Sequence, residues 1–150
     1  MPGRWSLYAR DAFNGTLLWK KPLVDWGWEA WSGSPTLQGK NGGRFTQPIH
    51  IPRTLAVDRD RVFVTLSYGE PVTVLDSLTG EQLAQYQETT NCDELVLGDG
   101  LLVAAVHGAA PEAKLSTVRS QKPVELGKHL VAIDTDTGRV RWRSRPYVGR

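Results

Sequence analysis

Residues 132–142, AIDTDTGRVRW, bring together side chains that could form a small binding site. Asp134 is followed by Thr137 and Gly138, and Trp142 stands eight residues after the Asp. A carboxylate and a hydroxyl can hydrogen-bond a polar ligand, and an indole can pack on it. The same side chains could instead shape a turn, because Asp and Thr often bond to nearby backbone N–H groups. Their recurrence in the chain helps to decide between these alternatives.

The motif occurs in three copies: ARDAFNGTLLW from Ala9, VLDSLTGEQLA from Val74 and AIDTDTGRVRW from Ala132. The matching positions are Ala9, Asp11, Gly15 and Trp19; Asp76, Thr79 and Gly80; and Ala132, Asp134, Thr137, Gly138 and Trp142. The second copy has Ala84 where the others have Trp, and Tyr86 lies two residues further along the same face. Self-similarity of this kind indicates a repeat architecture rather than one isolated site.

Each copy of the motif predicts a β-hairpin. An apolar, β-branched run leads into a short polar turn, and an alternating run leads out of it. Gly suits the turn position that needs a positive φ. After the third turn, one face of the expected strand carries Arg139, Arg141, Arg143 and Arg145. These residues could contact phosphate, but charges followed by a Pro are more typical of a protected edge strand.

Further strand candidates precede the second and third turns. TLAVD (54–58) and RVFVTLS (61–67) lead to the second turn, and ELVL (94–97) and LLVAAV (101–106) lead to the third. Together with the hairpins they predict four-stranded antiparallel meanders. The runs VFVTL and LLVAAV are apolar on both faces, as in strands that are covered on both sides. No segment has convincing helical periodicity, so the predicted class is all-β.

Four-stranded antiparallel units repeated along a chain predict the blades of a β-propeller. The predicted parts are the outer hairpin of a first blade (1–23), a Trp- and Gly-rich insert (24–52), a second blade (53–88) and a third blade (89–146) with its own insert (107–128). Together they make about two and a half blades, whereas a closed ring needs at least ~4. We therefore expect an incomplete propeller whose remaining blades belong to the same or another chain.

The pattern A-x-D-x-x-T-G-x-x-x-W resembles the tryptophan-docking motif of quinoprotein β-propellers, the pyrroloquinoline-quinone (PQQ) repeat family. The third copy matches every specified position, and the first has Asn14 in place of Thr. The second copy has neither the Ala nor the Trp. The resemblance covers residues 5–23 and 53–146. It implies a structural role for the motif, because the docking Trp in this family packs between neighbouring blades.

The resemblance implies two types of function. Some members are dehydrogenases that bind PQQ and Ca²⁺ in the central channel and oxidise alcohols or sugars, whereas others are scaffolds without a quinone. The adjacent cysteines of many such dehydrogenases are absent here, since Cys92 is the single cysteine. We therefore expect a non-catalytic scaffold or binding module, with PQQ and Ca²⁺ confined to a complete propeller. The alternative is a segment of a PQQ-dependent dehydrogenase.

Three Trp residues in the first insert, Trp26, Trp28 and Trp31, are candidate contacts with a ligand or a protein partner. Aromatic side chains on a loop could stack on a sugar, on a quinone or on an apolar anchor of a partner. They could also pack against the propeller, because a long insert must bury surface to be ordered. We favour packing, and a carbohydrate-binding propeller is the second alternative function.

Other polar groups give no catalytic site. The segment TNCDE (90–94) joins one thiol to two acids, but this set is poor for zinc and better fits a polar connection between blades. His50, His107 and His129 are unevenly spaced, and no nucleophile motif such as G-x-S-x-G accompanies them. We therefore assign no catalytic, cofactor-binding or metal-binding residue.

Composition argues against several classes of protein. The 150 residues carry a net charge of +2 with mixed signs, which gives no basic field for nucleic acid. No apolar run approaches the ~20 residues that span a bilayer. The start, MPGRWSLYARDAF, lacks the apolar core of a signal peptide, which favours a cytoplasmic protein or a piece of a longer secreted one. The family resemblance implies a periplasmic or secreted location.

Overall fold

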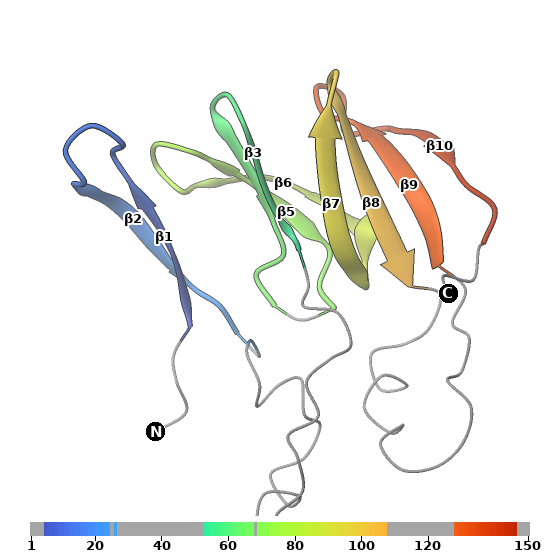
Figure 1. Ribbon diagram of the computed structural model, residues 1–150, viewed down its shortest axis with the longest axis horizontal. Coiled ribbons are helices and arrows are strands. Elements are labelled where there is room, and N and C mark those ends of the chain that lie inside the picture. The colour runs from blue at the N-terminus through green and yellow to red at the C-terminus, as the bar shows by residue number, and fades with distance from the viewer. Residues whose placement is uncertain (1–4, 25, 27–52, 68, 108–127, 147–150) are drawn as a thin grey trace, which may run out of the picture.

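The protein is described by a computed structural model over residues 5–24, 26, 53–67, 69–107 and 128–146 (Figure 1). Within these residues, ten strands form three antiparallel sheets. The first sheet, blade 1, pairs β1 (Ser6–Arg10) with β2 (Leu17–Pro22). Blade 2 contains β3 (Leu55–Asp58), β4 (Arg61–Val64), β5 (Val72–Asp76) and β6 (Gln82–Tyr86). Blade 3 contains β7 (Cys92–Gly98), β8 (Leu101–His107), β9 (Lys128–Asp134) and β10 (Val140–Arg143).

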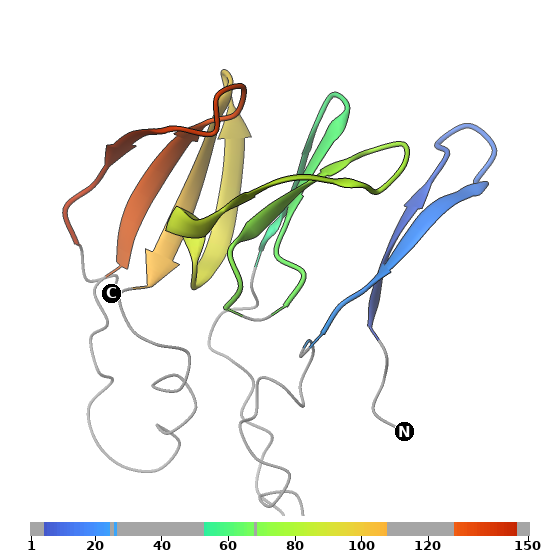
Figure 2. The ribbon, with the colours of Figure 1, turned by 180° about the vertical axis from the view of Figure 1, so that it is seen from behind.

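Blades 2 and 3 are meanders, in which strands that are consecutive in the sequence are hydrogen-bonded neighbours. A short 3-10 helix (Gln87–Thr89) connects the two blades. The three sheets stand side by side in chain order (Figures 1 and 2). The predicted all-β class with four-stranded antiparallel blades is confirmed, and the described sheets form an incomplete propeller.

The outer hairpin of every blade carries the same irregularity in strand register. The pairing skips Leu18 in β2, Leu83 in β6 and Arg141 in β10, which are matching positions of the three motif copies. An extra residue of this kind is a β-bulge, and it changes the direction of the side chains around it. The strict alternation predicted after the third turn is therefore interrupted at Arg141.

The hydrophobic core lies between the blades. One cluster joins blades 1 and 2 and includes Trp19, Val62 and Leu75. A larger cluster joins blades 2 and 3, where Phe63 and Tyr86 meet apolar side chains of β7, β8 and β9. Successive side chains of a strand point to opposite faces, so Val62 and Phe63 of β4 face different neighbours. Blade 2 is thus packed on both sides.

The two predicted inserts lie mostly outside the described residues. β8 extends to His107 and β9 begins at Lys128, so both ends of the insert predicted at 107–128 belong to strands. Of the insert predicted at 24–52, only the first residues are described, and they include the half-buried Trp26.

Candidate functional site

The Asp–Thr–Gly segments form turns that share a set of hydrogen bonds. In the third turn, Asp134 Oδ1 accepts from the N–H groups of Asp136 (3.1 Å) and Thr137 (2.9 Å) and from the Thr137 hydroxyl (3.0 Å). The N–H of Gly138 donates to the Asp134 carbonyl at 2.8 Å, with φ of +69° at Gly138. Gly is favoured there because a left-handed backbone costs other residues roughly 1–2 kcal/mol. Asp11 and Asp76 accept the matching backbone hydrogen bonds in the other blades.

Asn14 takes the place of Thr in the first turn. Its side-chain oxygen accepts a hydrogen bond from the N–H of Thr16 at 2.8 Å. In the second turn the Thr79 hydroxyl oxygen accepts from the N–H of Glu81 at 3.2 Å. An amide oxygen therefore replaces a hydroxyl oxygen as acceptor, and the first turn keeps the shape of the others.

The hydrogen bonds of the turns favour the charged form of the Asp side chains. The N–H groups of Thr79 and Leu78 lower the pKa of Asp76. The N–H and hydroxyl of Thr137 lower the pKa of Asp134. These carboxylates are already engaged as acceptors within the turns, so the geometry assigns them to the framework of the blades.

Trp19 of blade 1 packs against the turn of blade 2. Its indole Nε1 donates to the Ser77 carbonyl at 2.9 Å, and the residue is 9% exposed. A Cβ at Gly80 would lie 2.8 Å from the indole ring, so only a bare glycine lets the ring approach this closely. The partner of Trp19 across the hairpin is the small Ala9.

Tyr86 makes the corresponding contact between blades 2 and 3. It is 7% exposed, and a Cβ at Gly138 would lie 3.4 Å from its ring. Burial raises the pKa of the Tyr86 hydroxyl. Tyr86 stands two residues beyond Ala84, the position that carries Trp in the other copies. An aromatic ring thus reaches the next turn from a displaced position.

Trp142 is a motif aromatic residue with no turn glycine packed against it among the described residues. Gly15 is a turn glycine with no aromatic ring packed against it among those residues. Trp142 is 44% exposed, although it pairs with Ala132 across its hairpin as Trp19 pairs with Ala9. Among the described residues, a Cβ at Gly15 would meet no atom within 4 Å. Blade 3 therefore presents an exposed indole, and blade 1 presents an open turn.

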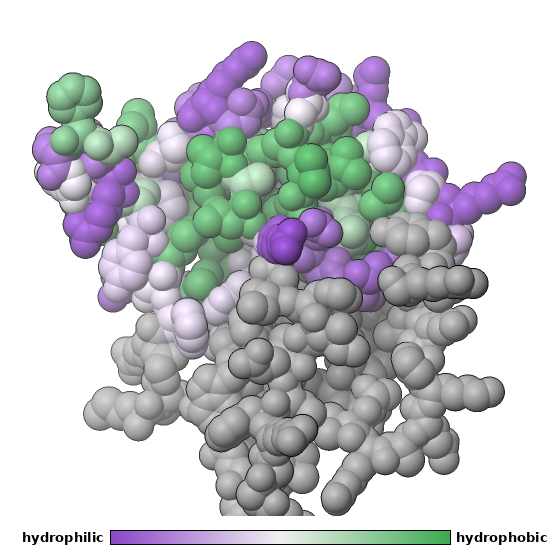
Figure 3. All heavy atoms as spheres, viewed as in Figure 1, coloured by the Kyte–Doolittle hydropathy of each residue, from purple (hydrophilic) through white to green (hydrophobic). Residues whose placement is uncertain are grey.

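Hydrophobic residues gather on one face of the molecule, over β3 and over β7 to β9 (Figure 3). The large exposed ones on β3 and β7 are Leu55, Val57 and Val96. Polar residues border the gathered hydrophobic residues in the same view. A contiguous apolar area with a polar border is typical of an interaction surface.

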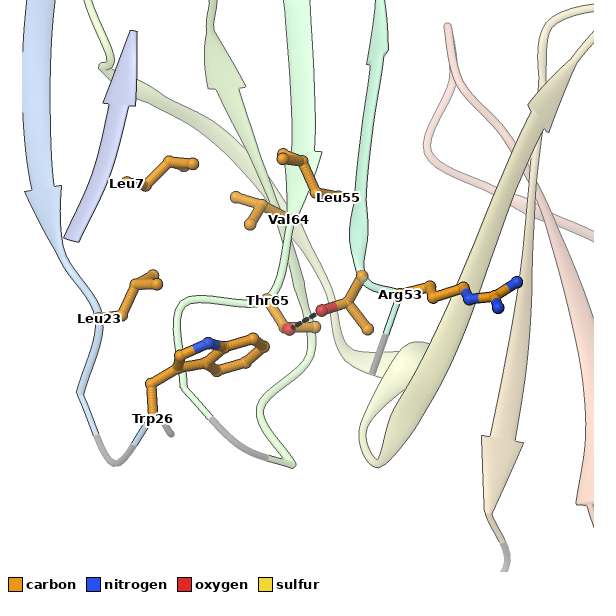
Figure 4. Close-up of a pocket in the computed structure, with 8 residues that line it drawn as sticks. Leu7, Leu23, Trp26, Arg53, Leu55, Val64 and Thr65 are labelled. Atoms are coloured by element: carbon orange, nitrogen blue, oxygen red, sulfur yellow. Dashed lines mark hydrogen bonds between the residues drawn. The ribbon is translucent and has the colours of Figure 1, made fainter. Parts of the chain in front are cut away.

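A pocket of about 260 Å³ lies between blades 1 and 2 (Figure 4). The Trp26 indole forms one wall, and Arg53 at the edge points away from the pocket. The hydroxyls of Thr54 and Thr65 are hydrogen-bonded to each other at 2.6 Å. The other lining residues are Leu7, Leu23, Leu55 and Val64. Such a space suits one apolar ring or side chain better than a sugar, whose hydroxyls each need a partner.

Comparison with known proteins identifies the family of the chain. The profile of a family described as outer membrane protein assembly factor BamB matches residues 3–146. The chain belongs to the PQQ-like β-propeller repeat family. No curated protein gives a match to the chain. The resemblance predicted from the three motif copies is therefore confirmed at the level of the family.

Two Arg residues connect the PQQ-like repeats of blades 2 and 3. Arg61 on β4 donates to the Thr135 carbonyl and, at 3.2 Å, to Asp136 Oδ1 in the third turn. Arg143, on the edge strand β10, pairs with Glu88 of the 3-10 helix. The sequence predicted the stripe that contains Arg143, but it singled out neither Arg61 nor the partners of the two Arg residues, which lie far away along the chain.

A cluster of charged residues lies at one end of blade 3, where β8 ends and β9 begins. Asp93 Oδ2 pairs with His107 and, at 2.9 Å, with Lys128 Nζ. Burial opposes ionisation of Asp93, but hydrogen bonds from His107 and Lys128 outweigh it and lower the pKa of Asp93 to about 2. The sequence grouped Asp93 with Cys92 instead. The Cys92 thiol is buried and donates to the Glu94 carbonyl at 3.2 Å.

Several residues that the sequence predicted as candidate contacts or catalytic groups lie outside the described residues. They are Trp28, Trp31 and His50. Across the described residues, no group of three or more His, Cys, Asp or Glu side chains could hold a metal ion. In that same part of the chain, no helix has the length and apolar character to cross a membrane.

Proposed function

We propose that this chain is a non-catalytic part of a PQQ-like propeller that serves as a scaffold or binding module within a larger protein. The observation that carries the proposal is the exposed indole of Trp142 on blade 3. At both internal junctions the matching aromatic ring, Trp19 or Tyr86, is buried against the next turn. A further blade, from the same or another chain, would bury Trp142 in the same way.

The hydrogen bonding within the turns supports a framework role for the motif. The carboxylates of Asp11, Asp76 and Asp134 each accept two backbone N–H groups of their own turn. A ligand that used these oxygens would compete with bonds that each contribute about 1 kcal/mol. The motif therefore contributes rigidity and inter-blade contacts.

The family match supports a role in assembly. The matching family is described as an outer membrane protein assembly factor, and assembly depends on surfaces that bind other proteins. The exposed residues Leu55, Val57 and Val96 give the chain such a surface. A periplasmic or secreted location is part of this proposal.

The first test measures quinoprotein activity. The longest natural polypeptide that contains these residues is incubated with PQQ and Ca²⁺, and reduction of a redox dye is followed with alcohols and sugars. A purified quinoprotein dehydrogenase is the positive control. We expect no reduction above the protein-free blank and no PQQ retained after desalting. Robust turnover would overturn the non-catalytic role in favour of a PQQ-dependent dehydrogenase.

The second test asks whether blade 3 is covered in the assembled protein. Difference fluorescence between the native protein and a Trp142→Phe variant isolates the emission of Trp142. In the assembled protein we expect that emission to be blue-shifted and protected from acrylamide, as for a buried indole. The 150-residue chain at low concentration is the exposed reference. An equally quenched Trp142 in the assembled protein would exclude a covering blade.

A further inference from the structure

We propose that the outer edge of blade 3 binds an acidic, extended segment of a partner protein through a row of Arg side chains. The row, called the Arg edge below, consists of Arg139, Arg141, Arg143 and Arg145. The inference rests on the proposed function in one respect, because both make the chain a binding module. It goes beyond that function by naming the surface and the chemistry of the partner.

The Arg edge lies on the periphery of blade 3. β10 is the last strand of its sheet, and β7 is the strand at the opposite edge (Figure 1). β7 is joined to the chain that leads into β3 by a bridge between Glu94 and Arg53, so the inner edges of blades 2 and 3 meet there. Blades of a propeller repeat radially around a central channel. A further blade of the same protein would cover a face of blade 3 and leave the outward side of β10 accessible.

The other two blades show what the framework alone requires. Their outer strands follow the same turn and the same bulge, yet they carry few charges at the four matching positions. Those positions are Thr16, Leu18, Lys20 and Pro22 in blade 1, and Glu81, Leu83, Gln85 and Gln87 in blade 2. β2 and β6 are edge strands too, so protection of an edge does not by itself require four Arg residues. The Arg edge is therefore an addition to blade 3.

Two members of the Arg edge are paired with carboxylates but remain accessible. Arg141 Nη1 lies 3.7 Å from Asp134 Oδ2, and the Arg141 side chain is 63% exposed. Arg143 pairs with Glu88, and its side chain is 47% exposed. A guanidinium has five N–H donors, so each of these groups can bond a further carboxylate.

The other two members of the Arg edge offer unpaired charges. Arg139 and Arg145 are exposed, and neither takes part in an ion pair among the described residues. They stand six residues apart in the sequence, which is about 20 Å along an extended chain. The Arg edge therefore presents separated positive charges along a line.

This line of charges fits a peptide that carries carboxylates. A guanidinium matches a carboxylate in a planar, two-bonded geometry, and acidic side chains on alternate residues of an extended peptide repeat roughly every 6.6 Å. The bulge at Arg141 interrupts the edge, so we assign the contact to side chains and not to a ladder of backbone hydrogen bonds. The net charge of the whole chain is only +2, which gives no broad basic field for a polyphosphate.

The test measures binding of a fluorescein-labelled, 12-residue peptide of alternating Glu and Ser to the 150-residue chain by fluorescence anisotropy. We expect saturable binding at low ionic strength that weakens as salt is added. Arg139→Gln/Arg145→Gln should weaken it about 5- to 30-fold, the combined effect of two exposed ion pairs. The same peptide with Gln in place of Glu should not bind.

Matched controls separate the Arg edge from the general charge of the chain. Lys20→Gln/Arg59→Gln removes two exposed cations elsewhere and should leave the affinity within about 2-fold of native. Glu88→Gln frees Arg143 and should tighten binding about 2- to 5-fold, whereas Glu94→Gln, the same change of charge beside Arg53, should not. Circular dichroism and urea midpoints confirm that every variant is folded.

Polyphosphate and phosphatidylglycerol vesicles serve as alternative ligands at equal charge. Binding of either one that depends on the Arg edge and exceeds that of the Glu peptide would overturn the acidic-peptide assignment. Absence of saturable peptide binding would overturn it too, and so would equal losses in Arg139→Gln/Arg145→Gln and Lys20→Gln/Arg59→Gln. None of these outcomes affects the dye-reduction test or the fluorescence test of Trp142, so the two proposals fail independently.

Discussion

Blades 2 and 3 have the same four-stranded meander but differ in how many of their faces are covered. In blade 2, the strand β4 is buried at Val62, Phe63 and Val64 in succession, because blades 1 and 3 pack on its two sides. In blade 3, burial alternates along β8. The buried residues Leu102, Ala104 and Val106 face blade 2, and the residues between them are only partly buried.

The comparison shows that neighbours decide how much of an apolar strand is buried. VFVTL and LLVAAV are both mostly apolar, and both predict a strand that is covered on both faces. The prediction holds for β4 but not for β8. β8 is apolar on both faces but covered on only one. Its other face is therefore where we expect a further blade or another partner to pack.

The largest effect is expected from the two docking Trp residues. Trp19→Ala should lower the free energy of unfolding by about 3–5 kcal/mol, because it removes a buried ring and the hydrogen bond to Ser77. Trp142→Ala should cost less than about 1 kcal/mol in dilute solution, because that ring is 44% exposed. Urea unfolding of both variants at low micromolar concentration gives the comparison. Equal losses would contradict the distinction between an occupied and an open junction.

The turn glycines of blades 1 and 2 sharpen the same comparison. Gly80→Ala should destabilise by about 2–4 kcal/mol, since it adds a clash with Trp19 to the cost of a positive φ. Gly15→Ala carries only the cost of the positive φ, about 1–2 kcal/mol. The double variant Gly80→Ala/Trp19→Ala is the control, because the clash term should vanish there. If Gly80→Ala costs no more than Gly15→Ala, the indole does not need a bare glycine.

Repetition made most of the fold predictable from the sequence. Three motif copies predicted the hairpins, and short apolar runs bounded by turns predicted the strands between them. The bulges at Leu18, Leu83 and Arg141 were missed, because an extra residue leaves no mark in a polar and apolar pattern. Tyr86 was proposed as the stand-in for the missing Trp by its place on the strand face, and its ring does lie beside Gly138.

Contacts between distant residues of blade 3 were not predictable from the sequence. Asp93, His107 and Lys128 meet because they lie at or next to the same end of three neighbouring strands, and no local spacing connects them. The pocket beside Trp26 combines residues of two blades for the same reason. Local patterns specify turns and strands, whereas such clusters depend on how the finished sheets are placed.

The Asp93 cluster gives blade 3 a dependence on pH in addition to that of the turn carboxylates Asp76 and Asp134, whose pKa is also lowered. The pKa of Asp93 is about 2 in the folded protein and 3.8 in its reference state, so its stabilisation is present above pH ~4. That stabilisation is lost as the pH falls from 4 towards 2. Because the site is partly solvated, we expect a loss of about 1 kcal/mol. Urea midpoints of the native chain and of Asp93→Asn should differ at pH 6 and converge near pH 2. A constant difference would show that Asp93 contributes through packing alone.

The smallest effect is expected at the rim of the covered junction, where Arg143 of blade 3 pairs with Glu88 beside blade 2. Both side chains are about half exposed, so solvent screens the pair. Arg143→Ala should cost about 0.5 kcal/mol, and a cycle with Glu88→Ala should give a coupling of ~0.2–1 kcal/mol that falls in high salt. Arg145→Ala, with the same loss of charge near the end of the same edge, is the control and should show no coupling to Glu88. A coupling above 2 kcal/mol would mean that the rim and not the aromatic contacts holds blade 3 to blade 2.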